Sequence, residues 1–475
     1  MLPYALTAHP FVRALRRPYK ALQACAACVI FGFPGRKLRV VGVTGTDGKT
    51  TTVHFIVKAL ESAGYTVGAI STIHYQVGTR VWTNKTKLTT PGPWELQKLL
   101  AHMVRAGCQY VVLECSSHRL DQNGFWGIPF DVAVITNITR EHFDYHRDFD
   151  DYARAKSRLF RGLNHPPKML PFRSGIDRGG RVSTTAVANL DNERAVAMLG
   201  ESAEKKYGFT LRESGISNHE LGNGAAVVSA HPVGEGLRAL PRAATEGRPY
   251  VVRVGGYEAL LFLKLPGKFN LQNALAAIAV GVSQHIPLAQ ITRELSEINR
   301  IPGRMDRVEV GQPFTVIVDY AVTPAAFEVL YAEVSNLKSQ DSRLIHVFGA
   351  AGERDRGKRP LLGEIAGGHA DLVILADEDP YGEDPDQILN DIEAGLVAAG
   401  SGQRAAGSEP TSYKLPAKSY LRIRDRRLAI REALRHARPG DIVLVTGKGA
   451  EETMAVGSQR VPWNDRRVIE EELMS

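Results

Sequence analysis

A glycine-rich turn followed at once by a lysine and three threonines lies near the start of the chain. An apolar run, Val40 to Val43, precedes the turn at 45–48, and a helical pattern over 53–63 follows it. The apolar run predicts a buried parallel strand. Strand, glycine turn, Lys-Thr and helix make a phosphate-binding loop, where backbone N–H groups and the positive end of the helix surround a polyphosphate.

This loop predicts an ATP site with magnesium. Lys49 would reach the terminal phosphates, and the Thr50 hydroxyl would bind Mg²⁺. The spacing departs from GxxxxGK[ST], because the residue five before Gly48 is Val43. A turn without a ligand is the structural alternative, but it gives the lysine and threonines no packing role. The predicted nucleotide-binding residues of the loop are Gly45, Thr46, Asp47, Gly48, Lys49, Thr50 and Thr51.

Two further segments carry residues suited to metal binding. Glu114 ends a predicted strand over 110–114, where an acid at a ligand crevice could hold Mg²⁺, although it could also cap the next helix. His142 lies in a stretch dense in His, Asp and Glu, which favours a metal ligand over a solitary polar histidine. Lys156, fourteen residues later among apolar neighbours, is by itself typical of a surface lysine.

The composition is that of a globular protein of two or three domains. The chain has 475 residues, of which 44% are hydrophobic and 23% charged. Net charge is +8, but the basic residues are scattered without aromatic interleaving, so we expect no nucleic-acid partner. The segment Ala21 to Phe33 is too short to span a bilayer and predicts an amphipathic helix on the ATPase domain. Four cysteines and an ATP site fit a reducing cytoplasm.

Strands and helices alternate along most of the chain, which predicts an α/β fold. We expect a central ATPase domain with a parallel sheet and a C-terminal Rossmann-like α/β domain. Between about 166 and 264 the expected strands are short, and we interpret this segment as an antiparallel insertion on the central domain. The expected boundaries are 1–37 for a helical N-terminal extension, 38–301 for the central domain and 302–475 for the C-terminal domain. The extension would pack through Phe11, Leu15, Leu22 and Ile30.

The motifs together resemble those of the Mur ligases, particularly the UDP-N-acetylmuramoyl-tripeptide synthetases. These enzymes join an amino acid to a carboxylate with ATP. The resemblance rests on GTDGKTTT, where Asp47 replaces the usual Asn, on ECSSH ending at His118, and on TNITREHFDYH with the later AKSRLF. It continues through LPGKFNLQNALAA, GRMDR, DYAVTP, FGAAGERDRGKRP, DRRLAI and GKGAE, so that it runs from about Val41 to the C-terminus.

The resemblance implies roles for particular residues. It implies that Lys156 is carbamylated and helps His142 to hold a second Mg²⁺, with Lys49 and Glu114 completing the catalytic set. It implies nucleotide contacts by Asn270 and Asn273 at the adenine and by Arg304 and Asp319 near the ribose. Lys358 and Arg359 are further candidates for phosphate or substrate contacts. The implied substrate-binding residues are Thr89, Thr90, Pro91, Ser116, Ser117, Arg354, Asp379, Pro380, Gly447 and Glu451.

Several departures from the family pattern concern the substrate. About forty residues precede the loop, so we expect the family's UDP-binding domain to be missing or replaced. Where the family has an arginine near the muramoyl peptide, this chain has Gly124, although Arg119 lies close by in the sequence. Where the family has two histidines, this chain has Val322 and Ala450. In the family's enzymes that add diaminopimelate, an arginine pairs with the distal carboxylate of that amino acid. Tyr381 stands at this position here, and the acids around it are Asp377, Glu378, Asp379, Glu383 and Asp384. This favours a cationic acceptor such as L-lysine, unless the loop is merely acidic and solvated.

The sequence therefore predicts an ATP-dependent amide-bond ligase of cytoplasmic location, acting through an acyl phosphate. Its expected partners are a UDP-MurNAc-peptide, an amino acid and ATP; we expect a monomer without a membrane span. An alternative is a folylpolyglutamate-synthase-like ligase with another carboxylate substrate, which the short N-terminus favours. A second alternative, a non-catalytic ATP-binding scaffold, conflicts with the presence of Lys49, His142 and Lys156.

Overall fold

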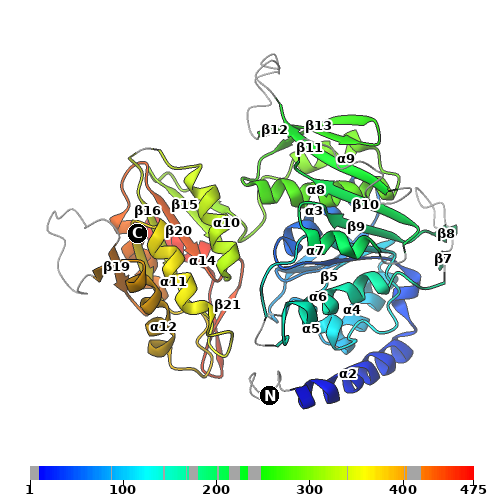
Figure 1. Cartoon of the computed structure of the whole chain (residues 1–475), viewed down its shortest axis with the longest axis horizontal. Coiled ribbons are helices and arrows are strands. Elements are labelled where there is room, and N and C mark those ends of the chain that lie inside the picture. Colours follow the sequence, from blue (N-terminus) through cyan, green and yellow to red (C-terminus); the bar gives the residue numbers. More distant parts are fainter. Residues whose placement is uncertain are drawn as a thin grey trace. The chain divides into compact units, whose positions relative to one another are not determined.

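A computed structural model shows two compact units, which divide the chain between Asn299 and Arg300 (Figure 1). It describes residues 10–86, 88–142, 145–166, 168–170, 180–200, 203–212, 225–233, 248–339, 341–400, 402–403 and 419–475, without the side chains of 10–15, 180, 248 and 402–403. The α/β fold class is confirmed, with a parallel-dominated sheet in each unit.

The first unit contains the predicted phosphate-binding loop. Its strands are β1 (Arg39–Thr44), β2 (Val67–Ile70), β3 (His74–Val77), β4 (Arg80–Thr83), β5 (Tyr110–Glu114), β6 (Val132–Ile135), β7 (Lys168–Leu170), β8 (Gly180–Val182), β9 (Thr185–Asn189), β10 (Lys205–Thr210), β11 (Ala225–Pro232), β12 (Arg248–Val254) and β13 (Tyr257–Leu263). Its helices are α2 (Pro10–Phe31), η1 (Pro34–Lys37), α3 (Lys49–Ser62), α4 (Pro93–Arg105), α5 (Ser117–Asp121), α6 (Phe149–Arg161), α7 (Glu193–Val196), η2 (Ala197–Gly200), α8 (Lys268–Ser283) and α9 (Leu288–Ser296).

One 11-stranded sheet runs through the described part of this unit in the order β13-β12-β11-β10-β9-β6-β1-β5-β2-β3-β4. Parallel pairing joins β11 through to β2, so the carboxyl ends of these strands share one edge. The central strands β1, β5 and β6 are buried almost throughout and mainly apolar, as expected of parallel strands with helices on both faces. Gly42 in β1 lets α6 approach closely, since a Cβ there would lie 2.6 Å from Leu159 Cδ1.

The expectation of an antiparallel insertion is confirmed only in part. Strands β9, β10 and β11 continue the central sheet in parallel register, whereas β11–β12–β13 pair antiparallel and β7 and β8 form a separate antiparallel pair. The sequence showed only that the strands are short. Strand direction depends on the path of the connections, which short strands separated by polar segments do not reveal.

Helix α2 confirms the predicted helical N-terminal segment and packs against α4 (Figure 1). The expectation that Leu22 and Ile30 form its packing face is wrong. Leu22 and Ile30 are exposed, whereas Ala24, Ala27 and Cys28 are fully buried. Small side chains allow the helix to lie close to its neighbours, so they form the contact face instead of the large ones. Phe11 and Leu15 lie outside the described side chains.

The second unit is a smaller α/β layer structure. Its strands are β14 (Asp306–Val308), β15 (Thr315–Asp319), β16 (Leu344–Phe348), β17 (Leu372–Leu375), β18 (Gly402–Gln403), β19 (Ser419–Arg422), β20 (Ile442–Thr446), β21 (Thr453–Val456) and β22 (Gln459–Pro462). Its helices are α10 (Pro324–Ser335), α11 (Lys358–His369), α12 (Pro385–Ala398), α13 (Arg426–His436) and α14 (Asp465–Met474).

The seven strands described in its main sheet have the order β14-β15-β20-β16-β17-β19-β18. All neighbours are parallel except β14 and β15, as the Rossmann-like expectation requires. Strands β21 and β22 form a separate hairpin. Of the helices in the described part of the whole chain, none has the length and apolar character needed to cross a bilayer.

Candidate active site

The phosphate-binding loop has the predicted strand–turn–helix form between β1 and α3. The Lys49 ammonium donates to the carbonyl oxygens of Gly45 at 3.0 Å and Thr46 at 2.6 Å. Gly48 has φ +79°, a left-handed conformation that glycine adopts without strain. A Cβ at Gly48 would also lie 2.3 Å from Asn273 Oδ1, so this position has no room for a side chain.

A neighbouring strand end fixes the shape of this loop. After β6, the Asn137 side-chain oxygen accepts from the backbone N–H groups of Thr46 at 3.2 Å and Asp47 at 2.9 Å. The Thr136 hydroxyl donates to the Asp47 carbonyl at 2.6 Å. Sequence reasoning missed these two residues as part of the site. Their position directly after a buried parallel strand is the signal that could have found them.

Glu114 lies beside Thr50 of the loop, so the side chains of the two expected oxygen ligands are adjacent. Thr50 Oγ1 donates to Glu114 Oε2 at 3.0 Å. Thr72, which follows β2, donates to the same carboxylate through its backbone N–H at 2.8 Å and its hydroxyl at 2.9 Å. Glu114 is buried, so these donors hold the carboxylate in one orientation. Thr72 is a third site residue that the sequence did not identify.

Lys156 is fully buried against the loop and not exposed as its own neighbours suggested. Its ammonium donates to the Gly45 carbonyl at 2.5 Å and lies 4.5 Å from the centre of the Tyr152 ring. Burial, followed by the positive charge of Lys49, lowers the pKa of Lys156 well below its usual range. The Tyr152 hydroxyl is 3.1 Å from Thr46 Oγ1, which links α6 to the loop a second time.

His142 belongs to a group of aromatic rings that also contains His118 and Tyr152. It has φ +59°, and its Nε2 is 3.5 Å from Glu141 Oε2. Its ring centre is 4.8 Å from that of His118 and 6.2 Å from that of Tyr152. The histidine thus lies near Lys156 through Tyr152, which contacts both.

The predicted substrate threonines and serines form one connected group. Thr90 Oγ1 donates to the Glu114 carbonyl at 2.8 Å and to Ser116 Oγ at 3.3 Å. The hydroxyls of Thr89 and Thr72 are 3.2 Å apart, and Pro91 is buried beside Thr90. Ser117 Oγ is 3.1 Å from Nε2 of the buried His146. Hydroxyl groups and Glu114 therefore share one edge of the sheet with the loop.

The two asparagines expected at the adenine lie at the start of α8. Asn270 donates to the Pro266 carbonyl at 2.6 Å, and Asn273 Oδ1 accepts from the Thr52 hydroxyl at 3.2 Å. Asn270 Oδ1 and Asn273 Nδ2 are buried and have no hydrogen-bond partner among the described residues. Buried polar atoms of this kind fit a site that receives a polar ligand.

In the second unit, the candidate nucleotide residues also make local contacts. Asp319 accepts from the backbone N–H groups of Met305 and Ala321, each at 2.8 Å. The Arg304 guanidinium lies 4.7 Å from the centre of the Tyr320 ring. These contacts hold the first turn after β15 in place.

The candidate acceptor residues surround a buried lysine that sequence reasoning missed. Lys448, which follows β20, is completely buried and pairs with Asp379 at 2.9 Å and with Glu451. Asp379 also accepts from the Ala455 N–H at 2.7 Å. Pro380 is buried, and Gly447 has φ +105° and lies against Glu378. The four predicted residues Asp379, Pro380, Gly447 and Glu451 thus meet around Lys448.

Most of the acids near Tyr381 are paired, which changes the expectation of a strongly acidic loop. Glu383 pairs with the buried Arg359 at 2.8 Å, so Arg359 serves the protein's own structure. Asp377 pairs with Arg424 at 3.6 Å, and Asp384 caps α12. The Lys358 ammonium donates to the Val322 carbonyl at 2.8 Å. Arg354 lies 5.6 Å from the Tyr381 ring centre, so a cation also borders this loop.

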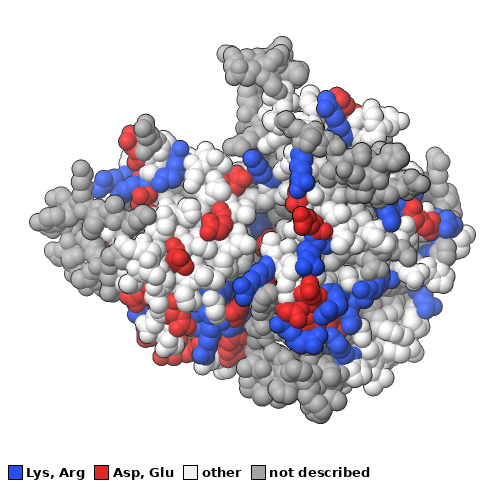
Figure 2. All heavy atoms as spheres, in the orientation of Figure 1, with Lys and Arg blue, Asp and Glu red and all other residues white. Residues whose placement is uncertain are grey.

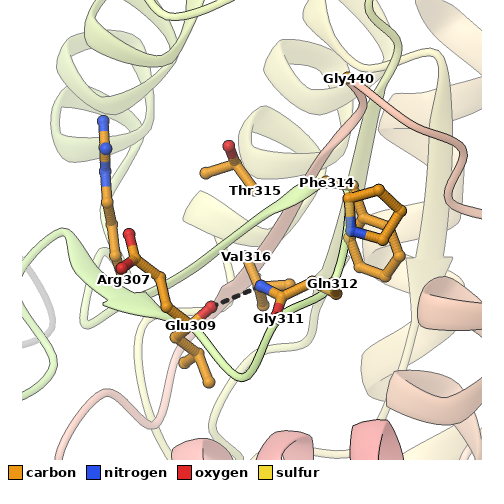
Figure 3. Close-up of a pocket in the computed structure, with 10 residues that line it drawn as sticks. Arg307, Glu309, Gly311, Gln312, Phe314, Thr315, Val316 and Gly440 are labelled. Carbon is orange, nitrogen blue, oxygen red and sulfur yellow. Dashed lines mark hydrogen bonds between the residues drawn. The ribbon is translucent and has the colours of Figure 1, made fainter.

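An open pocket of about 520 Å³ lies elsewhere in the second unit, at the amino ends of β15 and β20 (Figure 3). The dashed line in Figure 3 marks the hydrogen bond that Gln312 Nε2 donates to the Val308 carbonyl at 2.7 Å. The Gln312 oxygen accepts from the Val310 N–H at 2.9 Å. Its central amide is thus satisfied internally, and the pocket contains none of the predicted site residues.

On the face in Figure 2, Lys and Arg side chains of the described residues are interspersed with Asp and Glu.

Within the described residues, no three His, Cys, Asp or Glu side chains are grouped as a metal site. The candidate magnesium donors here are of another kind, a threonine hydroxyl and one carboxylate.

Comparison with known proteins gives a consistent result. Residues 43–281 match the model of the Mur ligase middle domain, and residues 303–449 match that of the Mur ligase glutamate ligase domain. A UDP-N-acetylmuramyl-tripeptide synthetase of Roseiflexus sp. (strain RS-1) is 41% identical over 458 residues, covering 96% of this chain and 82% of the relative. A UDP-N-acetylmuramoyl-L-alanyl-D-glutamate–2,6-diaminopimelate ligase of Geobacter metallireducens is 34% identical over 444 residues, covering 94% and 80%.

Among solved structures, Mycobacterium tuberculosis folylpolyglutamate synthase complexed with ADP is similar with a TM-score of 0.61. The alignment covers 90% of this chain and 91% of that one at 16% identity. At that identity the likeness concerns the fold alone.

Proposed function

The chain belongs to the Mur ligase family, and on that premise we propose that it adds an amino acid to a UDP-MurNAc-peptide with ATP. The observation that carries this proposal is the convergence of Lys49 and Lys156 on the Gly45 carbonyl beside the Thr50–Glu114 pair. Two relatives of at least 34% identity, both named as enzymes of this chemistry, support it.

The proposed reaction has two steps. A carboxylate oxygen of the donor peptide attacks the γ-phosphorus of ATP, which releases ADP and leaves an acyl phosphate. The amine of the acceptor then attacks the acyl carbon, phosphate leaves, and the amine loses a proton to give the amide. The Lys49 ammonium would exchange its hydrogen bonds to the Gly45 and Thr46 carbonyls for contacts with the oxygens of the transferring phosphoryl group, whose negative charge it would stabilise.

The residues present fit a magnesium ion. Thr50 and Glu114 present a hydroxyl and a carboxylate 3.0 Å apart, and oxygen ligands suit Mg²⁺. Bound there, the ion would neutralise charge on the phosphoryl oxygens. Thr72 would keep the Glu114 carboxylate in position for this task, because it donates to both carboxylate oxygens.

We propose that Lys156 is carbamylated and that it acts with His142 at a second Mg²⁺. A lysine must be neutral to attack CO₂, and burial lowers the pKa of Lys156. Its nitrogen would form a bond to the carbon of CO₂ and release a proton, which converts a cation into a carboxylate-like anion. Such an anion would offset the charge of Lys49, which shares the Gly45 carbonyl.

The remaining roles follow the same proposal. Asn270 and Asn273 would bind the adenine, and Arg304 and Asp319 would lie near the ribose. The group around Lys448, with Arg354 nearby, would bind the acceptor. We propose domains at 38–301 and 302–475, preceded by a helical extension, with closure between them during the reaction. A monomer in the cytoplasm, where ATP and the precursor would be available, fits this role.

The second candidate is a folylpolyglutamate-type ligase, which the likeness in fold keeps open. One experiment separates the two. Phosphate release with ATP and Mg²⁺ would be measured for UDP-N-acetylmuramoyl-L-alanyl-D-glutamate and for a folate donor, each with L-lysine, diaminopimelate or L-glutamate. The proposal expects release only with the muramoyl donor and an acceptor. Release with the folate donor alone would favour the alternative, and release with neither would contradict both.

A further inference from the structure

Arg119 lies inside the group of residues predicted to bind the donor. Its Nη2 donates to the Thr90 carbonyl at 3.3 Å, and its backbone N–H to Ser116 Oγ at 3.4 Å. Thr90 in turn donates to the carbonyl of Glu114, beside the phosphate-binding loop. One hydrogen-bonded chain therefore connects the guanidinium of Arg119 to the place where phosphoryl transfer is proposed.

The side chain of Arg119 packs directly over Gly124. A Cβ built at Gly124 would lie 2.0 Å from Arg119 Cδ and 2.9 Å from Cγ, and its three nearest atoms all belong to Arg119. The φ of Gly124 is not in the left-handed region, so the backbone alone would accept another residue. Glycine at 124 is needed because Arg119 occupies the space of a side chain there.

The guanidinium has donors to spare. A guanidinium has five N–H groups, and within the described residues Arg119 makes one side-chain hydrogen bond and no ion pair with an acid. Its Nε is buried without a partner among the described residues. Burial lowers the pKa of Arg119 to about 10, which still leaves it charged at neutral pH. A partly buried cation with unused donors is suited to binding an anion.

Helix α2 contributes a second cation, Lys20, whose charge interacts with that of Arg119. Lys20 donates to Gln23 at 2.9 Å, and its pKa is lowered by burial and then by the charge of Arg119. Arg17, one turn earlier on the same face, pairs with Asp121 of α5 at 2.5 Å and fixes the two helices together. Arg17 thus has an acid partner, whereas Lys20 and Arg119 repel each other.

We propose that Arg119 binds the carboxylate of the donor that does not react. This inference rests on the proposed function and names a specificity-determining residue for it. A donor ending in D-glutamate has two carboxylates, of which one is phosphorylated and the other stays anionic. Arg119 would pair with the second through its fork of N–H donors, so that the first points toward the ATP site.

The test uses UDP-N-acetylmuramoyl-L-alanyl-D-glutamate as the donor and measures KM for donor and for ATP separately. Arg119→Gln should raise the donor KM at least tenfold and leave the ATP KM within twofold of wild type. Gly124→Ala keeps the charge but displaces the side chain, so it should raise the donor KM as well. Arg119→Lys, which keeps the charge and loses the fork, should fall between. Arg105→Gln, at an exposed arginine of α4, is the matched control.

A donor amidated at the non-reacting carboxylate completes the test. The wild-type protein should bind the amidated donor as weakly as Arg119→Gln binds the native donor. The Arg119→Gln variant should have the same KM for the amidated and the native donor. An unchanged donor KM in Arg119→Gln or Gly124→Ala, with wild-type turnover, would overturn this inference and leave the proposed function standing. If wild type releases no phosphate with this donor, the proposed function fails and the inference fails with it. An unchanged ATP KM and melting temperature show that a variant has folded.

Discussion

Lys49 and Lys156 donate to the same carbonyl oxygen, that of Gly45, at 3.0 Å and 2.5 Å. They come from different helices, α3 and α6, and one of them is fully buried. Two ammonium groups on one acceptor repel each other, which contributes to the lowered pKa of Lys156. The proposed function gives the two lysines different tasks: Lys49 would contact a polyphosphate, and Lys156 would be converted to an anion.

Lys49→Ala should abolish ATP turnover without unfolding the protein. The Lys49 side chain contacts only loop carbonyls in the described structure, so its loss should cost little stability, whereas loss of its charge at the phosphates should lower kcat by about 10²-fold or more. Phosphate release and thermal unfolding check both parts. Lys58→Ala, on the exposed side of the same helix, is the control. Normal phosphate release by a folded Lys49→Ala variant would contradict the prediction.

Lys156→Ala should also lose activity, and formate or acetate should partly restore it. The added carboxylate would supply the anion that a carbamate provides in the wild type, and CO₂-free buffer should lower wild-type activity in the same way. Intact-protein mass under native conditions should show an added 44 Da, about one CO₂, on wild type only. A free amine at Lys156 together with full activity in CO₂-free buffer would refute this.

L-Lysine should support faster phosphate release than meso-diaminopimelate, and Glu378 should carry the difference. Glu378 is buried, and its carboxylate makes no hydrogen bond or ion pair with a described residue, while the other acids of the loop are paired or cap a helix. Burial and Asp379 raise its pKa, so a cationic acceptor would favour its ionised form. Competition at equal concentration measures the preference in wild type and in Glu378→Gln. Preferential incorporation of diaminopimelate by wild type would show that the prediction is wrong.

Glu383→Gln should destabilise the second unit by about 2 kcal/mol at neutral pH, because it leaves the buried Arg359 with one acid partner fewer. Hydrogen bonds from Arg359 lower the pKa of Glu383 from its usual 4.5 to about 2. Its stabilisation is therefore complete above about pH 4.5 and is lost as pH falls toward 2. Denaturant unfolding of both proteins from pH 7 to pH 2.5 should show the difference shrinking over that range. A difference that stays constant with pH would argue against this ion pair.

The local features of the candidate ATP site could be predicted from the sequence. The apolar run before Gly45, the lysine and threonine after Gly48, and Glu114 at a strand end all depend on residues adjacent in sequence. Parallel strands place their carboxyl ends at one edge, so adjacency to a strand end is enough to bring such residues together. The motifs also identified the family, because their residue types and spacing are specific.

What only the tertiary structure decided depends on contacts between distant segments. Lys156 is buried because Gly42 lets α6 approach β1, and nothing next to Lys156 in sequence shows this. Asp379 and Glu383 are paired by Lys448 and Arg359, which lie sixty-nine and twenty-four residues away. Arg119 takes the space over Gly124, and β9 to β11 join the sheet in parallel. Burial and pairing are properties of the packed chain, and a linear pattern does not fix which side chains fill the same space.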